Sequence, residues 1–149
     1  MAYGDETIEA VARERGRALV AYAYLLTGDL PEAEGLVQHA LVRTVLRPRA
    51  AADPATAEAE VRRTLLVAAA AGRRRRGPHA PAAARTPAHE ALLALPPAQR
   101  VCVVLHDLDG LPPDRIGGLL DLSTGTVRSH LADARLRMGS PAEAAGVRA

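Results

Sequence analysis

Apolar residues recur along most of this chain at the three- and four-residue spacing that places them on one side of an α-helix. In the first block, the apolar positions that share a helix face are Ile8, Val11, Ala18, Tyr22, Leu25 and Leu26. Gly28 follows this stripe and is expected to end the helix. The period-two alternation that predicts strands is nearly absent. The pattern therefore predicts an all-α fold.

Two more helices are predicted before the composition changes. Asp29 and Pro31 are typical of the start of a second helix, and Asp53 with Pro54 is typical of the start of a third. The face that the second helix is expected to bury contains Ala33, Leu36, Val37, Ala40, Leu41, Thr44 and Val45. The third helix carries Val61, Leu65, Ala68 and Ala69, and it is expected to run into four arginines.

Residues 77–88 hold three prolines and little to bury, which predicts a flexible linker. We therefore expect two small helical domains, at residues 1–76 and 89–138, followed by a disordered tail at residues 139–149. The second domain is expected to begin with short helices around residues 90–95 and 97–108.

The end of the second domain has the pattern of a helix-turn-helix. After a break at residues 109–111, one helix is predicted at 113–120, and another starts at Ser123 as its N-cap and runs to Met138. Gly117 and Gly118 weaken the first of these helices by about 1 kcal/mol each relative to alanine. A small residue where two helices cross after a tight turn is typical of this motif.

Composition excludes several classes of protein. The chain has 149 residues, no Phe or Trp, and 19 basic residues, every one of which is arginine. The absence of Lys, Asn and Phe indicates a GC-rich bacterial genome. One cysteine excludes an internal disulfide framework, and the scattered histidines do not form a metal-binding motif. No phosphate-binding loop or nucleophile elbow is present. We expect no enzyme activity, no metal and no cofactor.

The sequence also predicts a cytoplasmic protein. No apolar run approaches the roughly 20 residues that a membrane span needs, and the N-terminus lacks the order of a signal peptide. Residues 51–89 carry seven arginines against three acids, whereas residues 90–138 carry five against six. A DNA-reading domain is normally basic, and here the positive charge of the second domain gathers in its last helix.

Three segments together resemble the extracytoplasmic-function sigma factors of RNA polymerase, in their actinobacterial form. AYLLTGDLPEAEGLVQHALVRT, at residues 23–44, is similar to part of region two, and VRRTLLVAAAAGRRRR, at 61–76, is similar to the helix that follows. Residues 91–138 resemble region four throughout, including a Leu-Pro-Pro-x-x-Arg motif and the turn LLDLSTGTVRS. The resemblance implies that region two binds the polymerase clamp and melts the promoter. It implies that region four places its second helix in the major groove of DNA.

The resemblance assigns candidate binding residues. The polymerase-binding candidates are Glu34, Leu36, Val37, Gln38 and His39. The DNA-binding candidates are Arg115, Ser123, Thr124, Thr126, Arg128, Ser129, His130, Arg135 and Arg137, together with the run Arg73, Arg74, Arg75 and Arg76. Arg128 is the best candidate for a bidentate contact to guanine, because the N-terminal turns of a recognition helix face the base edges.

Region two departs from the family pattern. The family typically has acidic residues where this chain has Gly35 and His39, and it places an asparagine and aromatic rings where this chain has Val67 and a run of alanines. Flipped bases are usually held on aromatic or apolar walls. We therefore expect poor promoter opening by the protein alone.

Two other functions remain open. One is an interaction protein descended from a sigma factor, which binds an anti-sigma factor, another sigma factor or a regulator. The other is a DNA-binding protein like a response regulator, because residues 126–131 also resemble that recognition helix, although the region-two resemblance argues against it.

Single features also have plain structural interpretations. The arginine run suits the negative end of a helix dipole. Tyr22 and Tyr24 are interpreted as core and surface residues instead of a base-stacking pair, His39 as a surface substitution, and His130 as either a groove contact or an exposed helix residue. Cys102 lies among apolar residues and is expected to be an inert buried thiol.

Overall fold

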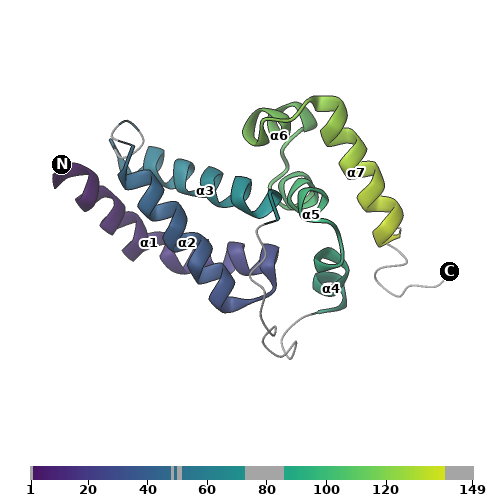
Figure 1. The fold of residues 1–149 in the computed structure, drawn as a ribbon, viewed down its shortest axis with the longest axis horizontal. Coiled ribbons are helices and arrows are strands. Elements are labelled where there is room, and N and C mark those ends of the chain that lie inside the picture. Colours follow the sequence, from purple (N-terminus) through teal and green to yellow (C-terminus); the bar gives the residue numbers. More distant parts are fainter. Residues whose placement is uncertain (1, 48, 50–51, 73–85, 140–149) are drawn as a thin grey trace. The chain divides into compact units, whose positions relative to one another are not determined.

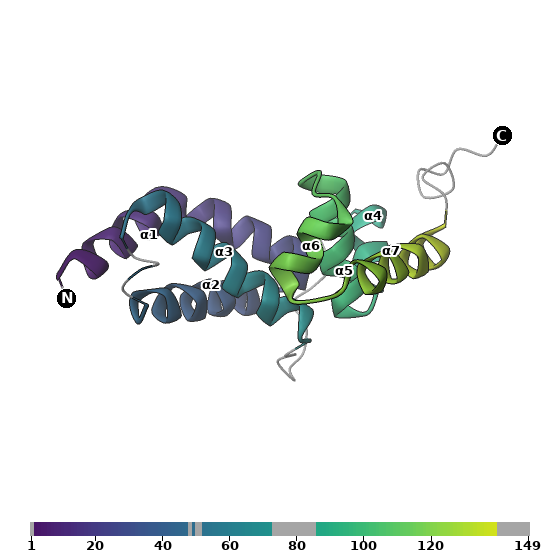
Figure 2. The same ribbon diagram turned by 90° about the horizontal axis from the view of Figure 1, so that it is seen from above.

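The computed structural model describes residues 2–47, 49, 52–72 and 86–139, and every regular element within them is helical (Figures 1 and 2). This confirms the all-α prediction. Two compact units are present, unit 1 at Met1–Ala68 and unit 2 at Ala69–Ala149. The arginines at 73–76, residues 77–85 of the predicted linker and residues 140–149 of the predicted tail lie outside the described residues.

Unit 1 is built from α1 (Ala2–Thr27), α2 (Leu30–Val45) and all but the last two residues of α3 (Pro54–Ala70). α2 runs back along α1, and α3 lies against this pair (Figures 1 and 2). Gly28 ends α1 in the left-handed conformation, at φ 68, as predicted. The buried side chains of unit 1 are Ile8, Val11, Leu19, Ala23, Leu26, Ala33, Val37, Ala40, Thr44, Ala57, Val61, Leu65 and Leu66.

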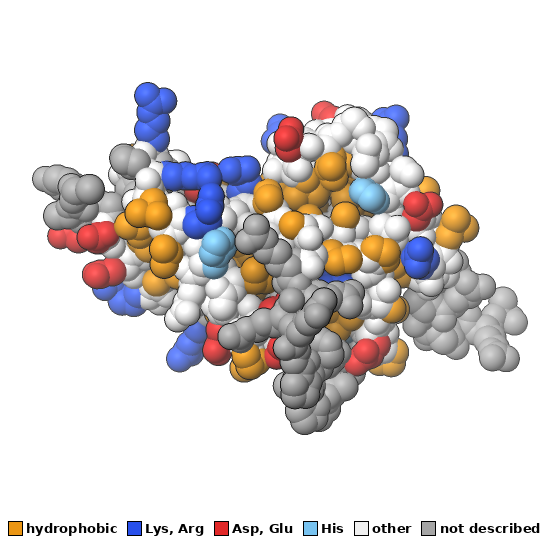
Figure 3. All heavy atoms as spheres, viewed as in Figure 1, with side chains coloured by type: hydrophobic (Ala, Val, Ile, Leu, Met, Phe, Trp, Pro, Cys, Tyr) orange, Lys and Arg blue, Asp and Glu red, His pale blue; other side chains and the backbone are white. Residues whose placement is uncertain are grey.

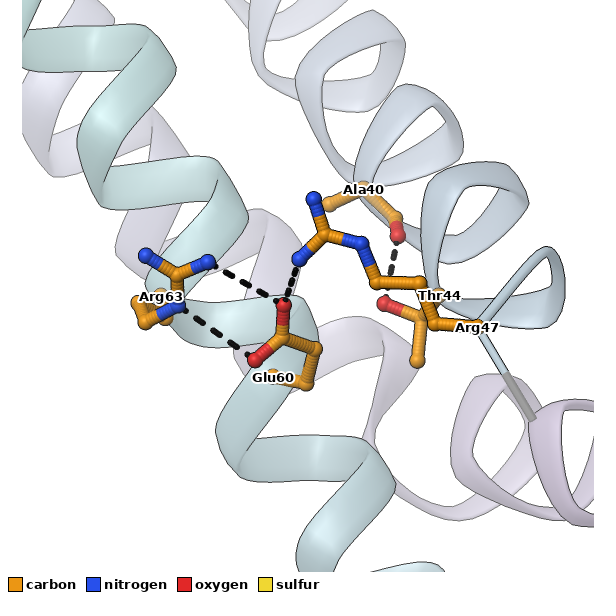
Figure 4. A network of polar contacts seen from close by, with 5 residues as sticks. All are labelled: Ala40, Thr44, Arg47, Glu60 and Arg63. Atoms are coloured by element: carbon orange, nitrogen blue, oxygen red, sulfur yellow. Dashed lines mark hydrogen bonds and ion pairs between the residues drawn. The ribbon is translucent and has the colours of Figure 1, made fainter. Parts of the chain in front are cut away.

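The buried stripe of α1 differs from the predicted one at its centre. Leu19 and Ala23 are buried, whereas Ala18 is exposed and Tyr22 is only half-buried. α2 buries the predicted face, where the Thr44 hydroxyl donates a hydrogen bond of 2.8 Å to the carbonyl of Ala40 (Figure 4). This bond satisfies a polar group that would otherwise be costly to bury.

The helix starts of unit 1 are capped unequally. The Asp53 carboxylate accepts a hydrogen bond of 2.9 Å from the backbone N–H of Thr56 and one of 2.6 Å from its hydroxyl. These bonds lower the pKa of Asp53. Asp29 stands at the N-cap of α2, but its side chain makes no capping hydrogen bond. Both helix starts were predicted from the sequence. The capping predicted for Asp29 is wrong, because only Asp53 accepts a capping hydrogen bond through its side chain.

α3 ends before the arginine run that it was predicted to enter. Its last residue is Ala70, and Gly72 follows in the left-handed conformation, at φ 69. The N–H of Gly72 donates to the carbonyl of Ala69 at 3.2 Å, which closes the end of the helix.

Unit 2 contains α4 (Pro87–Leu93), α5 (Pro97–Val103), the π-helical turn η1 (Val104–Leu108), α6 (Pro113–Leu120) and α7 (Thr124–Met138). Thr86 caps α4 by accepting a hydrogen bond of 3.1 Å from the N–H of His89. The helix therefore begins inside the predicted linker, which extended to residue 88. The single helix predicted at 97–108 is instead α5 continued by a π turn.

Buried polar groups fix the loops on either side of α5 and η1. Arg100 donates hydrogen bonds of 2.9 Å to the carbonyls of Leu93 and Leu95, which holds the end of α4 against α5. After η1, Nδ1 of His106 donates to the carbonyl of Leu111 at 3.0 Å, because a carbonyl can only accept. The Arg100 contacts fix the chain before α5, and the His106 contact positions the chain that leads into α6.

Cys102 is fully buried in α5, and this burial raises the pKa of its thiol to about 11. We expect the thiol to resist alkylation at neutral pH, because reaction needs an accessible thiolate. Alkylation rates measured by mass spectrometry, with and without denaturant, check this. Rapid labelling of the native protein would contradict an inert thiol.

None of the helices in the described part of the chain is both long enough and apolar enough to cross a membrane.

Candidate nucleic-acid interface

α6, the following turn and α7 form a helix-turn-helix in unit 2. The turn places Asp121 in the left-handed conformation, at φ 58 and ψ 47, and the N–H of Leu122 donates to the carbonyl of Gly117 at 2.8 Å. A Cβ at Gly117 would lie 2.5 Å from the carbonyl oxygen of Leu122, whereas one at Gly118 would meet no atom within 4 Å. The small residue predicted at the crossing is therefore Gly117.

The start of α7 is fixed by its cap. The Ser123 hydroxyl accepts a hydrogen bond of 3.1 Å from the N–H of Thr126 and lies 2.8 Å from the hydroxyl of Thr126. The N-cap prediction for Ser123 is confirmed. Because these two hydroxyls bond to one another, both side chains hold the first turn of the helix in one geometry.

α7 buries one face and exposes the rest. Val127, Leu131 and Ala134 are buried against the rest of unit 2, where α7 packs on α5 and α6. The predicted DNA-binding residues that are exposed are Arg115, Ser123, Thr126, Arg128, Ser129, Arg135 and Arg137. Thr124 and His130 are half-buried at the edges of the buried face. This helix can therefore lie along a nucleic-acid groove without losing its packing.

The arginines of α7 flank its outward face instead of lying at its centre. At 100° per residue, Arg128 and Arg135 fall on one flank and Arg137 on the other. Ser129, Ala132 and Leu136 lie between them, and Leu136 is 84% exposed. Leu136 was not among the predicted DNA-binding residues.

The outward face of α2 carries most of the residues predicted to bind polymerase. Glu34, Gln38 and His39 are exposed, and Leu36 is half-buried. Val37 is only 4% exposed and packs in the core of unit 1, so its predicted role as a polymerase contact is wrong. It lies on the opposite side of the helix from Gly35, where α2 meets α1.

The same outward face also carries apolar side chains that were not among the predicted polymerase contacts. Val42 and Leu46 are exposed large apolar side chains, and a Cβ at Gly35 would have open space around it. Gly35 and His39 supply no carboxylate to this surface. Glu34 therefore lies there beside apolar and neutral groups.

The C-terminal half of α3 presents small side chains. Val67 is exposed, and Ala68, Ala69 and Ala70 are half-buried. Tyr22, on α1, does not supply a free ring to this region, because the Arg62 guanidinium lies over it at 4.4 Å from the ring centroid. The interpretation of Tyr22 as a packing residue agrees with this contact.

In the part of the chain that the structure describes, no group of three or more histidine, cysteine or carboxylate residues lies together as a metal ion would require.

Comparisons with known proteins agree with the helix-turn-helix geometry. Residues 85–138 match the family described as Sigma-70, region 4. An RNA polymerase sigma-E factor from Streptomyces avermitilis is 33% identical over 156 aligned positions, which cover 92% of this chain and 87% of that protein. An RNA polymerase sigma-E factor from Streptomyces coelicolor is 32% identical, covering 87% of this chain and 83% of that protein. Alignments of this extent include unit 1 as well as unit 2.

Proposed function

Because the chain belongs to the extracytoplasmic-function sigma factors of RNA polymerase, in their actinobacterial form, we propose that it binds promoter DNA through α7 and the polymerase through α2. A sigma-factor-like role in transcription follows from the family itself. The proposal concerns which surfaces of this chain carry that role.

The observation that carries the DNA-binding proposal is the geometry of α7. Its cap and its buried face fix the helix, while Thr126, Arg128 and Ser129 in its first turns are exposed. A recognition helix presents such turns to base edges in the major groove. Arg128 can then donate two hydrogen bonds to one guanine, and Arg115, Arg135 and Arg137 can neutralise phosphates.

Two substitutions in α7 are expected to have different effects on DNA binding. Arg128→Ala is expected to reduce discrimination between cognate and altered sites by about 1–3 kcal/mol, because one base contact is lost. Arg137→Ala is expected to weaken binding evenly across sequences and to reduce the salt slope by about one unit, because one phosphate contact is lost. Fluorescence anisotropy titrations at several salt concentrations measure both quantities.

Arg13→Ala provides a control, since Arg13 is exposed on α1, outside α7, and its loss removes the same single charge. A wild-type protein whose DNA binding is absent or independent of salt would contradict the DNA-binding proposal.

The polymerase-binding proposal rests on the exposed row formed by Glu34 and Gln38, one helical turn apart on α2. Their positions suit polar contacts to a basic surface of the polymerase. In a pull-down, the tagged wild-type chain is expected to retain purified core polymerase, and the Glu34→Arg variant is expected to retain much less. Equal retention by the two would contradict this binding surface.

A second candidate function is partner binding without promoter opening. The exposed Val42 and Leu46 and the loss of acidic side chains on α2 favour it, since an anti-sigma factor or another regulator could bind such a surface. Under this alternative, the chain associates with a regulatory protein and has no effect in a purified transcription reaction.

A further inference from the structure

One ion-pair network in unit 1 joins the end of α2 to α3 (Figure 4). Nε of Arg63 donates to Oε2 of Glu60, and Nη2 of Arg63 donates to Oε1, each at 3.3 Å. Arg47, which follows α2, donates through Nη1 to the same Oε1 of Glu60. A single carboxylate therefore holds two guanidinium groups from different parts of the sequence.

The three side chains differ in their access to solvent. Glu60 is 19% exposed, whereas Arg47 and Arg63 are 44% and 45% exposed. The carboxylate is thus less exposed than the two guanidinium groups, and the surface of this network is mainly positive. Basic side chains gather over α3 in the space-filling view (Figure 3).

The charges of the network do not cancel. Burial by itself would raise the pKa of Glu60, but the hydrogen bond and charge of Arg63 and the charge of Arg47 outweigh it and lower this pKa. Glu60 is therefore ionised at neutral pH and neutralises one of the two arginines. Arg43, exposed on α2 one turn before Arg47, adds a further positive charge to the same side of the unit.

Both arginines keep hydrogen-bond donors for another partner. A guanidinium has five N–H donors, and the contacts to Glu60 use one from Arg47 and two from Arg63. Paired N–H groups of this kind match the oxygens of a phosphate. Since the two side chains share one carboxylate, they lose less conformational freedom on binding than two independent arginines would.

We propose that Arg47 and Arg63 bind the phosphodiester backbone of a DNA strand and that Glu60 is the residue that positions them. This inference rests on the proposed function, because it assumes that the chain engages promoter DNA. It assigns to unit 1 a phosphate contact separate from α7 and from the arginines at 73–76. α3 has no aromatic ring, so a strand held on this helix depends on cations.

The chain offers a matched control for this proposal. Nε of Arg15 lies 2.9 Å from Oε1 of Glu58, so that an α1 arginine pairs with a carboxylate two residues before Glu60. This pair is also exposed, but it holds only one arginine. Equivalent substitutions at the two sites change the net charge of the chain by the same amount.

The test is the binding of the full chain to a fluorescein-labelled random-sequence single strand, followed by anisotropy at several salt concentrations. A single strand offers no major groove to α7. The double variant Arg47→Ala with Arg63→Ala is expected to reduce the salt slope by about 1.4, at about 0.7 for each phosphate contact. Arg63→Ala by itself is expected to reduce the slope by about 0.7. Arg15→Ala, which removes the same single charge, is expected to leave the slope at the wild-type value.

Glu60→Ala separates positioning from charge. Charge alone predicts that Glu60→Ala and Glu58→Ala both strengthen binding equally, because each removes one negative charge. Positioning predicts that only Glu58→Ala does so, while Glu60→Ala binds more weakly than Glu58→Ala by severalfold. Circular dichroism spectra and melting curves establish that each variant remains folded, and Glu60→Gln serves as the milder variant if Glu60→Ala unfolds.

The outcomes distinguish this inference from the proposed function. Equal slopes for the Arg47/Arg63 variant, the Arg15 variant and the wild type would overturn the inference, even if α7 binds duplex DNA as proposed. Equal strengthening by Glu60→Ala and Glu58→Ala would overturn the positioning role of Glu60. If the Arg47/Arg63 variant reduces the slope as expected but Arg128→Ala has no effect on duplex binding, the proposal for α7 is overturned and this inference is not.

Discussion

With purified RNA polymerase, this protein is expected to support far less transcription from a duplex promoter than from the same promoter carrying an artificial bubble. Unstacking a base costs a few kcal/mol, and stacking it on an aromatic ring returns about 1–3 kcal/mol. Residues 67–72 read Val-Ala-Ala-Ala-Ala-Gly and contain no ring. A deficit of about 3 kcal/mol corresponds to a loss of roughly 100-fold in promoter opening.

The structure removes one alternative source of that stacking energy. Tyr22 is the aromatic residue that packs beside α3, and Arg62 covers its ring. The bubble bypasses the melting step, so binding to polymerase and to the upstream DNA is all that the bubble template requires. The ratio of run-off transcripts from the two templates therefore isolates the melting step.

A substitution that restores a ring provides the control. Ala71 is exposed just after the end of α3, and Ala71→Trp is expected to raise transcription from the duplex while leaving the bubble template unchanged. Ala71→Leu adds apolar bulk without a ring. Efficient duplex transcription by the wild type would show that the alanine stretch does not limit opening. Inactivity on both templates would favour the partner-binding function.

Alanine substitutions at the two adjacent glycines of α6 are expected to change the stability of unit 2 in opposite directions. Gly117→Ala is expected to destabilise unit 2 by about 1–3 kcal/mol, because its Cβ would lie 2.5 Å from the backbone oxygen of Leu122. That oxygen belongs to the turn before α7, so relief of the clash moves α7. We expect duplex DNA binding to fall with the stability.

Gly118→Ala is expected to stabilise the same helix by about 1 kcal/mol, since its Cβ would meet open space and alanine has the higher helix propensity. Circular dichroism melts, with hydrogen exchange of α6 and α7 to locate the change, measure both variants. A shift of 1 kcal/mol corresponds to about 4–8 °C for a unit of this size. Equal effects of the two substitutions would contradict a close crossing at Gly117.

Much of the candidate DNA interface was predictable because its signals are local. The bounds of α6 agree with the predicted 113–120, and α7 starts after Ser123 and ends at Met138, as predicted. Proline, glycine and capping side chains act through the backbone of their own turn, so a sequence displays them directly.

The polymerase-binding candidates were less predictable. The motif placed five neighbouring residues together, but a helix turns by 100° at each residue, so they cannot all face outward. Whether Val37 or Glu34 faces solvent depends on where α1 lies, and the motif does not contain that information. The same reason explains why Leu19, and not Ala18, is buried in α1.

The sequence by itself determined the helices, the turn between α6 and α7, and the family, since these depend on local backbone chemistry and on motif order. Only the tertiary structure decided which arginines share Glu60, that Arg62 covers Tyr22, and that the predicted helix at 97–108 turns π-helical at Val104. Arg47 and Glu60 are 13 residues apart in sequence. Contacts between separate helices depend on how their faces pack, and that packing minimises exposed apolar area over the whole unit.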